Sequence, residues 1–303
     1  MRILTLSDFE SAAHLVTKYQ EGISFPAPFQ DMIREAMEAG KVKVCLTESS
    51  ESIPNGFGVI GQVSGKIHAI WIDNTNEDLD QDSINMLENK ILDWCFEEIK
   101  TPPERIDFPK MTEHIKSELL RRGYVEYKRA GMSASRDELM KNHRVVLPEG
   151  FSLIPYQTTM RDKVADIAAE ANRNHVDAII YPEFFSSKEK ALEFLEKLEG
   201  NTFGEFVDGV SQVLVKGEQT IGYCMITGKG HDVGISDIGL LPVYQGKGLG
   251  KALLVNTILD LLHSDDSVQK INLAVTLSNP ARFLYEKCGF QVTDEFFAII
   301  HSA

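Results

Sequence analysis

Cysteine is scarce in this 303-residue sequence, which has only Cys45, Cys95, Cys224 and Cys288 and no C-x-x-C pair. Four dispersed cysteines predict reduced and mostly buried thiols in a cytoplasmic protein, not a disulfide framework. The eight histidines show no H-x-x-x-H or H-E-x-x-H spacing. Cysteine and histidine, which bind transition metals, therefore lack the spacing of known metal motifs, and we expect no metal site.

Long apolar runs and basic residues are also lacking. No run of 18 apolar residues occurs, so the sequence predicts no transmembrane helix. The segment Met1–Asp8 reaches an acid before any long apolar stretch, which argues against a secretory signal. Only 31 Lys and Arg face 45 Asp and Glu, and the formal net charge is −14. This charge argues against nucleic-acid binding, which needs basic residues at the phosphates, and is compatible with a cationic acceptor.

Against this acidic background, one short segment combines three glycines with two lysines. Within Pro242–Lys251, the residues Gly246, Gly248 and Gly250 alternate with others, and an apolar helix is predicted over 251–262. Glycine has no Cβ, so the backbone can approach a ligand and adopt positive φ. The first N–H groups of the helix have no partners within it and carry the positive end of its dipole. The segment therefore predicts an anion site, most often a phosphate site.

The spacing separates three kinds of glycine loop, and a plain strand–helix turn is a further alternative. A P-loop requires Gly-x-x-x-x-Gly-Lys-Ser/Thr, but Gln245 stands at the first glycine and Ala252 at the hydroxyl position. A dinucleotide fingerprint requires G-x-G-x-x-G after a first strand, and this loop is one residue short and late in the chain. Neither motif fits.

The third kind of loop fits. Gln245-x-x-Gly248-x-Gly250, after a strand that ends at Pro242, resembles the acyl-CoA pyrophosphate loop of the GNAT superfamily of N-acyltransferases. Downstream, the segment from Asn279 to Phe290 resembles the family's N-x-x-A-x-x-x-Tyr-x-x-x-Gly-Phe helix and turn, with Ala one place early. The resemblance implies an α/β fold, a mostly antiparallel sheet flanked by helices. It also implies acetyl-CoA as acyl donor, no metal, and direct transfer of the acetyl group to a primary amine of a small molecule or protein.

Hydrophobic periodicity and turn residues predict a similar order of elements in both halves of the chain. The predicted helices are 7–21, 31–39, 83–96, 112–122, 159–175, 188–198, 251–262 and 280–287. The predicted strands are 41–47, 57–63, 66–72, 105–111, 124–133, 210–215, 220–227, 234–241, 271–277 and 291–300.

The two halves are interpreted as a tandem duplication with a degenerate first copy. Leu119–Tyr124 corresponds to Tyr285–Phe290 at an offset of 289 − 123 = 166 residues. At that offset the acidic segment Asp78–Ser83 stands close to the place of the glycine loop, where its carboxylates would repel a pyrophosphate. We predict a degenerate GNAT-like domain over 1–140 and an acyl-CoA-binding acetyltransferase domain over 149–303. A polar linker, Ser135–Pro148, is expected between their folded cores.

The resemblance also implies how the donor is held. The backbone of the strand carrying Leu240 and Leu241 pairs with pantetheine, residues 245–250 hold the pyrophosphate, and two neighbouring strands diverge beside them. Asn279 corresponds to an asparagine that often hydrogen-bonds the cofactor, whereas its place before a helix also predicts a cap or turn residue. The predicted donor-binding residues are Leu240, Leu241, Gln245, Gly246, Lys247, Gly248, Leu249, Gly250, Lys251 and Asn279.

Tyr285 is the predicted general acid, because it matches the family tyrosine that protonates the leaving thiolate. A phenol with a pKa of about 10 keeps its proton at neutral pH, as an acid must. The residues alone leave a second interpretation open. Ala281, Leu284, Tyr285 and Cys288 form a helical stripe that is also typical of a packed core.

Asp237 is the candidate general base, acting through water, and a solvated strand residue is the alternative. Strict alternation places it on one face with Ile235 and Gly239. Tyr181 and Glu183 lie where the family builds its acceptor groove, and His175 is expected at the surface or at a helix cap. The alternative to an enzyme is a non-catalytic CoA-binding or regulatory module.

Overall fold

The computed structural model describes residues 2–5, 9, 12–21, 23, 28–48, 54–62, 64–73, 75, 79–207 and 209–302. The chain forms two compact units, the first of Met1–Glu126 with Phe297–Ala303 and the second of Tyr127–Phe296. This division differs from the expected domains 1–140 and 149–303. Strand β6 (Tyr124–Ser135) was expected to close the first domain, but residues 129–135 pair with strand β11 (Lys270–Thr276) of the second unit.

The first unit has an antiparallel sheet with helices on both faces. Strands β1 (Arg2–Ile3), β2 (Val42–Glu48), β3 (Pro54–Gly61) and β4 (Ile67–Ile72) lie in that order. A short strand, β5 (Arg105–Ile106), pairs with the last residues of β12 (Gln291–His301). The helices are α2 (Ala13–Gln20), α3 (Phe29–Glu38), α4 (Gln81–Ile99) and α5 (Glu113–Arg121).

Alternation along β2 shows how both faces of this sheet are covered. Val44 and Leu46 pack in one cluster with residues of α2 and α3, whereas Cys45 between them packs in another cluster with residues of α4 and α5. Successive side chains of a strand point to opposite faces, so each face buries its own apolar layer.

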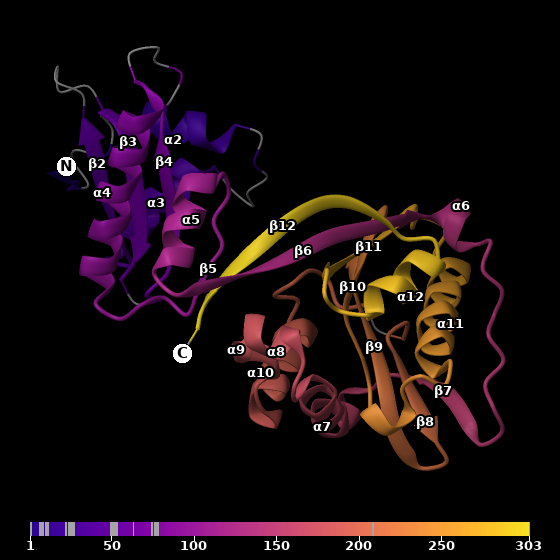
Figure 1. The fold of residues 1–303 in the computed structure, drawn as a ribbon. Coiled ribbons are helices and arrows are strands. Elements are labelled where there is room, and N and C mark those ends of the chain that lie inside the picture. Colours follow the sequence, from indigo (N-terminus) through magenta and orange to yellow (C-terminus); the bar gives the residue numbers. More distant parts are fainter. Residues whose placement is uncertain are drawn as a thin grey trace. The chain divides into compact units, whose positions relative to one another are not determined.

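The second unit is also a mostly antiparallel sheet, in the order β12-β6-β11-β10-β9-β8-β7 (Figure 1). Among the described pairings within it, only β10 with β11 is parallel. Its other strands are β7 (Phe151–Pro155), β8 (Gln212–Lys216), β9 (Gln219–Lys229) and β10 (Asp232–Leu240). The helices are α6 (Arg136–Leu139), α7 (Arg161–Asn172), α8 (Val176–Ile180), α9 (Pro182–Phe185), α10 (Lys188–Glu199), α11 (Leu249–Ser264) and α12 (Ala281–Lys287), with 3₁₀ turns at Thr158–Met160 and Pro242–Tyr244.

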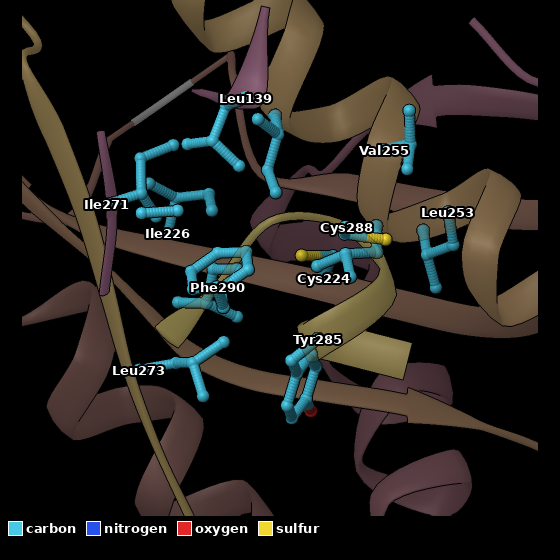
Figure 2. Close-up of a cluster of buried hydrophobic side chains, with 14 of the residues drawn as sticks. Leu139, Cys224, Ile226, Leu253, Val255, Ile271, Leu273, Tyr285, Cys288 and Phe290 are labelled. Atoms are coloured by element: carbon cyan, nitrogen blue, oxygen red, sulfur yellow. The ribbon is translucent and has the colours of Figure 1, made fainter. Parts of the chain in front are cut away.

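Two apolar clusters cover the two faces of this sheet. One contains residues of α11, with Tyr285, Cys288 and Phe290 (Figure 2). The other packs α7, α9 and α10 against Tyr223 and Met225 of β9. The expected fold class is confirmed, since each unit is a mostly antiparallel sheet flanked by helices.

Most predicted elements are present with shifted ends, and a few were missed. Strand β7 and the short helices α8 and α9 were not predicted, and the expected linker 135–148 contains α6. All four cysteines are free and buried, as expected. Within the described ranges, no helix has the length and apolar character needed to cross a bilayer.

Candidate functional site

The parallel strands β10 and β11 separate partway along their length. Their pairing ends at Gly234 and Asn272, although β10 continues to Leu240 and β11 to Thr276. A cavity of about 400 Å³, here called the strand cavity, is lined by residues 235–240 of β10 and 273–275 of β11. The divergence implied by the family resemblance is therefore present in the fold.

The glycine loop borders the strand cavity. Gly246 and Gly248 have φ of +70° and +80°. Residues other than glycine adopt this backbone conformation only at a cost in free energy. A Cβ added at either position would meet no atom within 4 Å, so the space in front of the loop is open. Gly248 is the N-cap of α11, and Gln245 Nε2 donates a 2.9 Å hydrogen bond to the carbonyl oxygen of Leu240. The loop thus presents the N-terminus of a long helix beside the cavity, the geometry that suits a phosphate.

The predicted donor-binding residues divide into two groups. Those that line the strand cavity are Leu240, Gln245, Gly246, Gly250 and Asn279. The others lie around it: the N–H of Leu241 donates to Ile221, Lys247 Nζ donates to the carbonyl oxygen of Val243, Leu249 is buried in the core, Lys251 is exposed, and Gly248 caps the helix.

Tyr285 belongs to the core and to the cavity at once. Its side chain is 7% exposed and its ring lies 6.2 Å from that of Phe290, yet it lines the strand cavity together with Ala281 and Leu284. In Figure 2 its hydroxyl points away from Cys288. Among the described residues this hydroxyl has no hydrogen-bond partner. Burial raises the pKa of Tyr285 most, and nearby anionic groups, including Asp237, raise it further. The phenol therefore keeps its proton at neutral pH.

A β-bulge determines where Asp237 points. Ile235 is paired with Ile226 and Asp237 with Met225, so Ser236 is an extra residue in β10. Ile235 packs in the cluster of Ile226, whereas Met225 belongs to the cluster on the other face. The expectation that Asp237 shares a face with Ile235 is therefore wrong, because the bulge interrupts the alternation.

The Asp237 carboxylate is half-buried and accepts a 2.6 Å hydrogen bond from the hydroxyl of Tyr223. The pKa of Asp237 is raised to about 6, because burial and the charge of Asp177 raise it more than the hydrogen bond from Tyr223 lowers it. Such a carboxyl group exchanges a proton close to neutral pH, which is the property required of a general base. Asp237 thus lies at the cavity wall with a hydrogen bond from a buried tyrosine.

Asp177 was missed in the sequence, since no motif marks it. Its carboxylate accepts hydrogen bonds from Thr276 Oγ1 at 2.9 Å and Asn279 Nδ2 at 3.1 Å, and His175 Nδ1 lies 3.1 Å away. Burial alone would raise the pKa of Asp177, but the bonds from His175 and Thr276 hold it below its ordinary value. The bond to Asp177 in turn raises the pKa of His175. Asn279 also accepts from the N–H of Ala281, so it has the predicted turn role and lines the cavity.

A second cavity of about 340 Å³, here called the aromatic cavity, adjoins the first. Of the two residues expected near an acceptor groove, Tyr181 lines this cavity, whereas Glu183 is not among its described lining residues. The other ring-bearing residues of the wall are Phe184, Phe185, Phe194 and Phe203. The residues that line both cavities are Asp177, Phe185, Ile235, Ser236, Asp237 and Ala274.

Comparison with known proteins finds similarity to N-acetyltransferases over part of the chain. The family model described as "Acetyltransferase (GNAT) domain" matches residues 208–292. The [ribosomal protein bS18]-alanine N-acetyltransferase of Haemophilus influenzae is 41% identical over 81 residues, 27% of this chain. The chain spans about half, 54%, of the length of that curated relative.

Solved structures resemble the chain over nearly its whole length. A GCN5-related N-acetyltransferase from Sphaerobacter thermophilus has a TM-score of 0.61 at 14% identity and covers 98% of this chain and 93% of its own. A tandem GNAT protein from the clavulanic acid biosynthesis pathway has a TM-score of 0.55 at 11% identity and covers 98% of this chain and 96% of its own. At these identities the likeness is one of fold alone.

Proposed function

We propose that this chain transfers an acetyl group from acetyl-CoA to a primary amine of a small molecule or protein, which the match of residues 208–292 to the GNAT acetyltransferase domain supports. One observation carries the proposal. Three separate segments of the second unit supply an anion-binding loop, a buried phenol and a carboxyl group of raised pKa to a single cavity. Loop, acid and base are what acyl transfer from a thioester to an amine requires.

The strand cavity fits the elongated donor. The open space before Gly246 and Gly248 suits the pyrophosphate, which the first N–H groups of α11 would bind. The unpaired stretches of β10 and β11 leave backbone groups facing the cavity, and these suit the amides of pantetheine. A backbone N–H near Leu240 would polarise the thioester carbonyl.

The two titratable side chains supply the proton transfers. Asp237 takes a proton from the acceptor ammonium, through water, and so provides a neutral amine whose lone pair forms the C–N bond. The C–S bond breaks and its electron pair goes to sulfur. Tyr285 gives its proton to that thiolate, the nitrogen of the new amide gives its second proton to water, and the phenolate is reprotonated from solvent. Asp237 has a pKa near neutrality and Tyr285 a raised one, so each is in the required protonation state at the start.

We assign the first unit as the degenerate copy. Leu119 stands at the place of Tyr285, and Asp80 caps the N-terminus of α4 by accepting a 2.8 Å hydrogen bond from the N–H of Ser83. A carboxylate thus already binds the helix end that corresponds to the glycine-loop end of α11. Asp78 of the same acidic segment lies outside the described residues.

The test is release of free thiol from acetyl-CoA across a panel of amines. Turnover with any of them supports the enzyme, whereas tight acetyl-CoA binding without turnover supports the alternative of a non-catalytic or regulatory module. The phenol of Tyr285 at the cavity wall favours the enzyme, since a module that only binds CoA has no use for it. We place the activity in the cytoplasm, where four free thiols stay reduced.

A further inference from the structure

The wall of the aromatic cavity is a cluster of interacting rings. Tyr181 and Phe184 are stacked with centroids 6.0 Å apart, and Phe184 lies 4.9 Å from Phe194. Phe203 meets Phe184 edge to face at 5.8 Å. Phe194 is 6% exposed, but Phe203 is 43% exposed at the rim. Rings in edge or offset contact form an apolar surface that receives another aromatic group well.

A guanidinium group lies at the same cavity. Arg129 on β6 is only 7% exposed and lines the aromatic cavity. Its guanidinium carbon lies 4.7 Å from the centroid of Tyr181 and 5.4 Å from that of Phe296. Arginine presents planar donors that match a carboxylate, and burial strengthens such a charge-assisted bond.

The carboxylates lie on the side that adjoins the strand cavity. Asp177 and Asp237 line both cavities, so an amine close to them lies between the aromatic wall and the thioester site. Their negative charge attracts an ammonium group, and Asp237 has the raised pKa needed to take its proton. Ring wall, guanidinium and carboxylates therefore offer three different contacts within one small space.

We propose that the acceptor is a free α-amino acid with an aromatic side chain. This inference rests on the proposed function and adds the substrate class. The ring lies against the Phe184–Phe194–Phe203 wall, the α-carboxylate binds Arg129, and the α-amine faces Asp237. In the reaction the α-ammonium gives one proton to Asp237, and the neutral nitrogen then bonds to the acetyl carbon and gives a second proton to water. The C–S bond breaks and the thiolate receives the proton of Tyr285, which gives an N-acetyl amino acid and CoA.

Four acceptors test the three contacts with the full chain and acetyl-CoA. They are phenylalanine, phenethylamine, which lacks the carboxylate, phenylalanine amide, which lacks its charge, and alanine, which lacks the ring. We expect kcat/KM for phenylalanine to exceed that for alanine by roughly 10- to 100-fold, from burial of the ring. It should exceed that for phenethylamine and the amide by roughly 10-fold or more, from the charge-assisted bond.

Two variants assign each preference to its residue. Arg129→Gln should reduce the ratio of phenylalanine to phenethylamine toward one, while the preference for phenylalanine over alanine persists. Phe203→Ala changes an exposed rim position and should have little effect on folding. It should lower the ratio of phenylalanine to alanine and leave the ratio of phenylalanine to phenethylamine unchanged. Arg282→Gln is the matched control, because its guanidinium pairs with Glu286 outside the aromatic cavity.

A binding measurement separates this proposal from the acetyltransferase activity itself. With CoA as the unreactive partner, phenylalanine should raise the melting temperature of the wild type more than alanine does. Absence of thiol release with every amine would refute the proposed function, while the thermal shift would still decide the substrate class. Equal kcat/KM for phenylalanine, phenethylamine and alanine, or equal thermal shifts for phenylalanine and alanine, would overturn the inference.

Discussion

The hydroxyl of Tyr223 on β9 donates a 2.6 Å hydrogen bond to the carboxylate of Asp237 on β10. The contact depends on Gly239, the residue paired with Tyr223, because a Cβ there would lie 2.5 Å from the tyrosine ring. Tyr223 is fully buried, so its ring has a fixed place under the strand. The bond opposes the effect of burial on the pKa of Asp237, and Tyr223 is therefore a positioning residue that tunes the base.

Tyr223→Phe should move the acidic limb of the pH–rate profile upward. The hydrogen bond stabilises the charged carboxylate, so its loss raises the pKa of Asp237 above about 6. The kcat/KM of the variant should fall most at acidic pH and approach the wild-type value at alkaline pH. Tyr124→Phe is the matched control, a buried tyrosine of the first unit that donates to Pro103. An unshifted profile would show that Tyr223 does not tune the base.

Asp237→Asn should lower turnover by roughly 10² or more, the scale for loss of a general base. Whereas turnover falls, the free energy of unfolding of the variant should rise relative to wild type. The pKa of Asp237 rises from its ordinary 3.8 to about 6 on folding, so its contribution to the free energy of unfolding is full below pH 3.8 and is lost as the pH rises through 6. Asparagine cannot ionise, and the variant should gain stability relative to wild type between about pH 4.5 and pH 7.5.

Urea unfolding of both proteins at those two pH values measures this difference. If the variant is less stable than wild type at neutral pH, and less so at acidic pH, the fold stabilises the ionised carboxylate. Asp237 would then have no raised pKa, and its role as a base near neutrality would be refuted.

Tyr285→Phe should lower turnover by roughly 10² while leaving acetyl-CoA affinity unchanged, because the ring still packs against Phe290. The hydroxyl has no partner among the described residues, so its removal should not lower the melting temperature. Single-turnover kinetics and calorimetry measure the two effects. Equal single-turnover rates would make Tyr285 a packing residue only.

Sequence motifs predicted the two parts of the site that each lie within one short segment. The loop with Gly246, Gly248 and Gly250, and the helix that carries Tyr285, each lie within one short segment with recognisable spacing. The resemblance to the GNAT family then predicted that two neighbouring strands diverge, as β10 and β11 do. Glycine at positive φ and a helix N-terminus are properties of the chain itself, so the sequence shows them directly.

The rest of the site depends on tertiary pairing that no local pattern reports. Arg129 belongs to a strand expected to close the first domain, but the pairing of Arg129 with Thr276 brings it to the second sheet. The bulge at Ser236 has no sequence signature, so Asp237 was assigned to the wrong face. Asp177 joins the site through Thr276 and Asn279, about 100 residues downstream along the chain.

Calorimetric titration with acetyl-CoA tests the central claim, that the glycine loop of the second unit is the single donor site, most directly. Both Gly248→Ala and Gly248→Glu strain the backbone at φ +80°, at a cost of about 1 kcal/mol, but only glutamate adds charge and bulk in the open space before the loop. We predict one site per chain in the wild type, one in Gly248→Ala and none in Gly248→Glu. Two sites in the wild type, or a site retained in Gly248→Glu, would contradict the account.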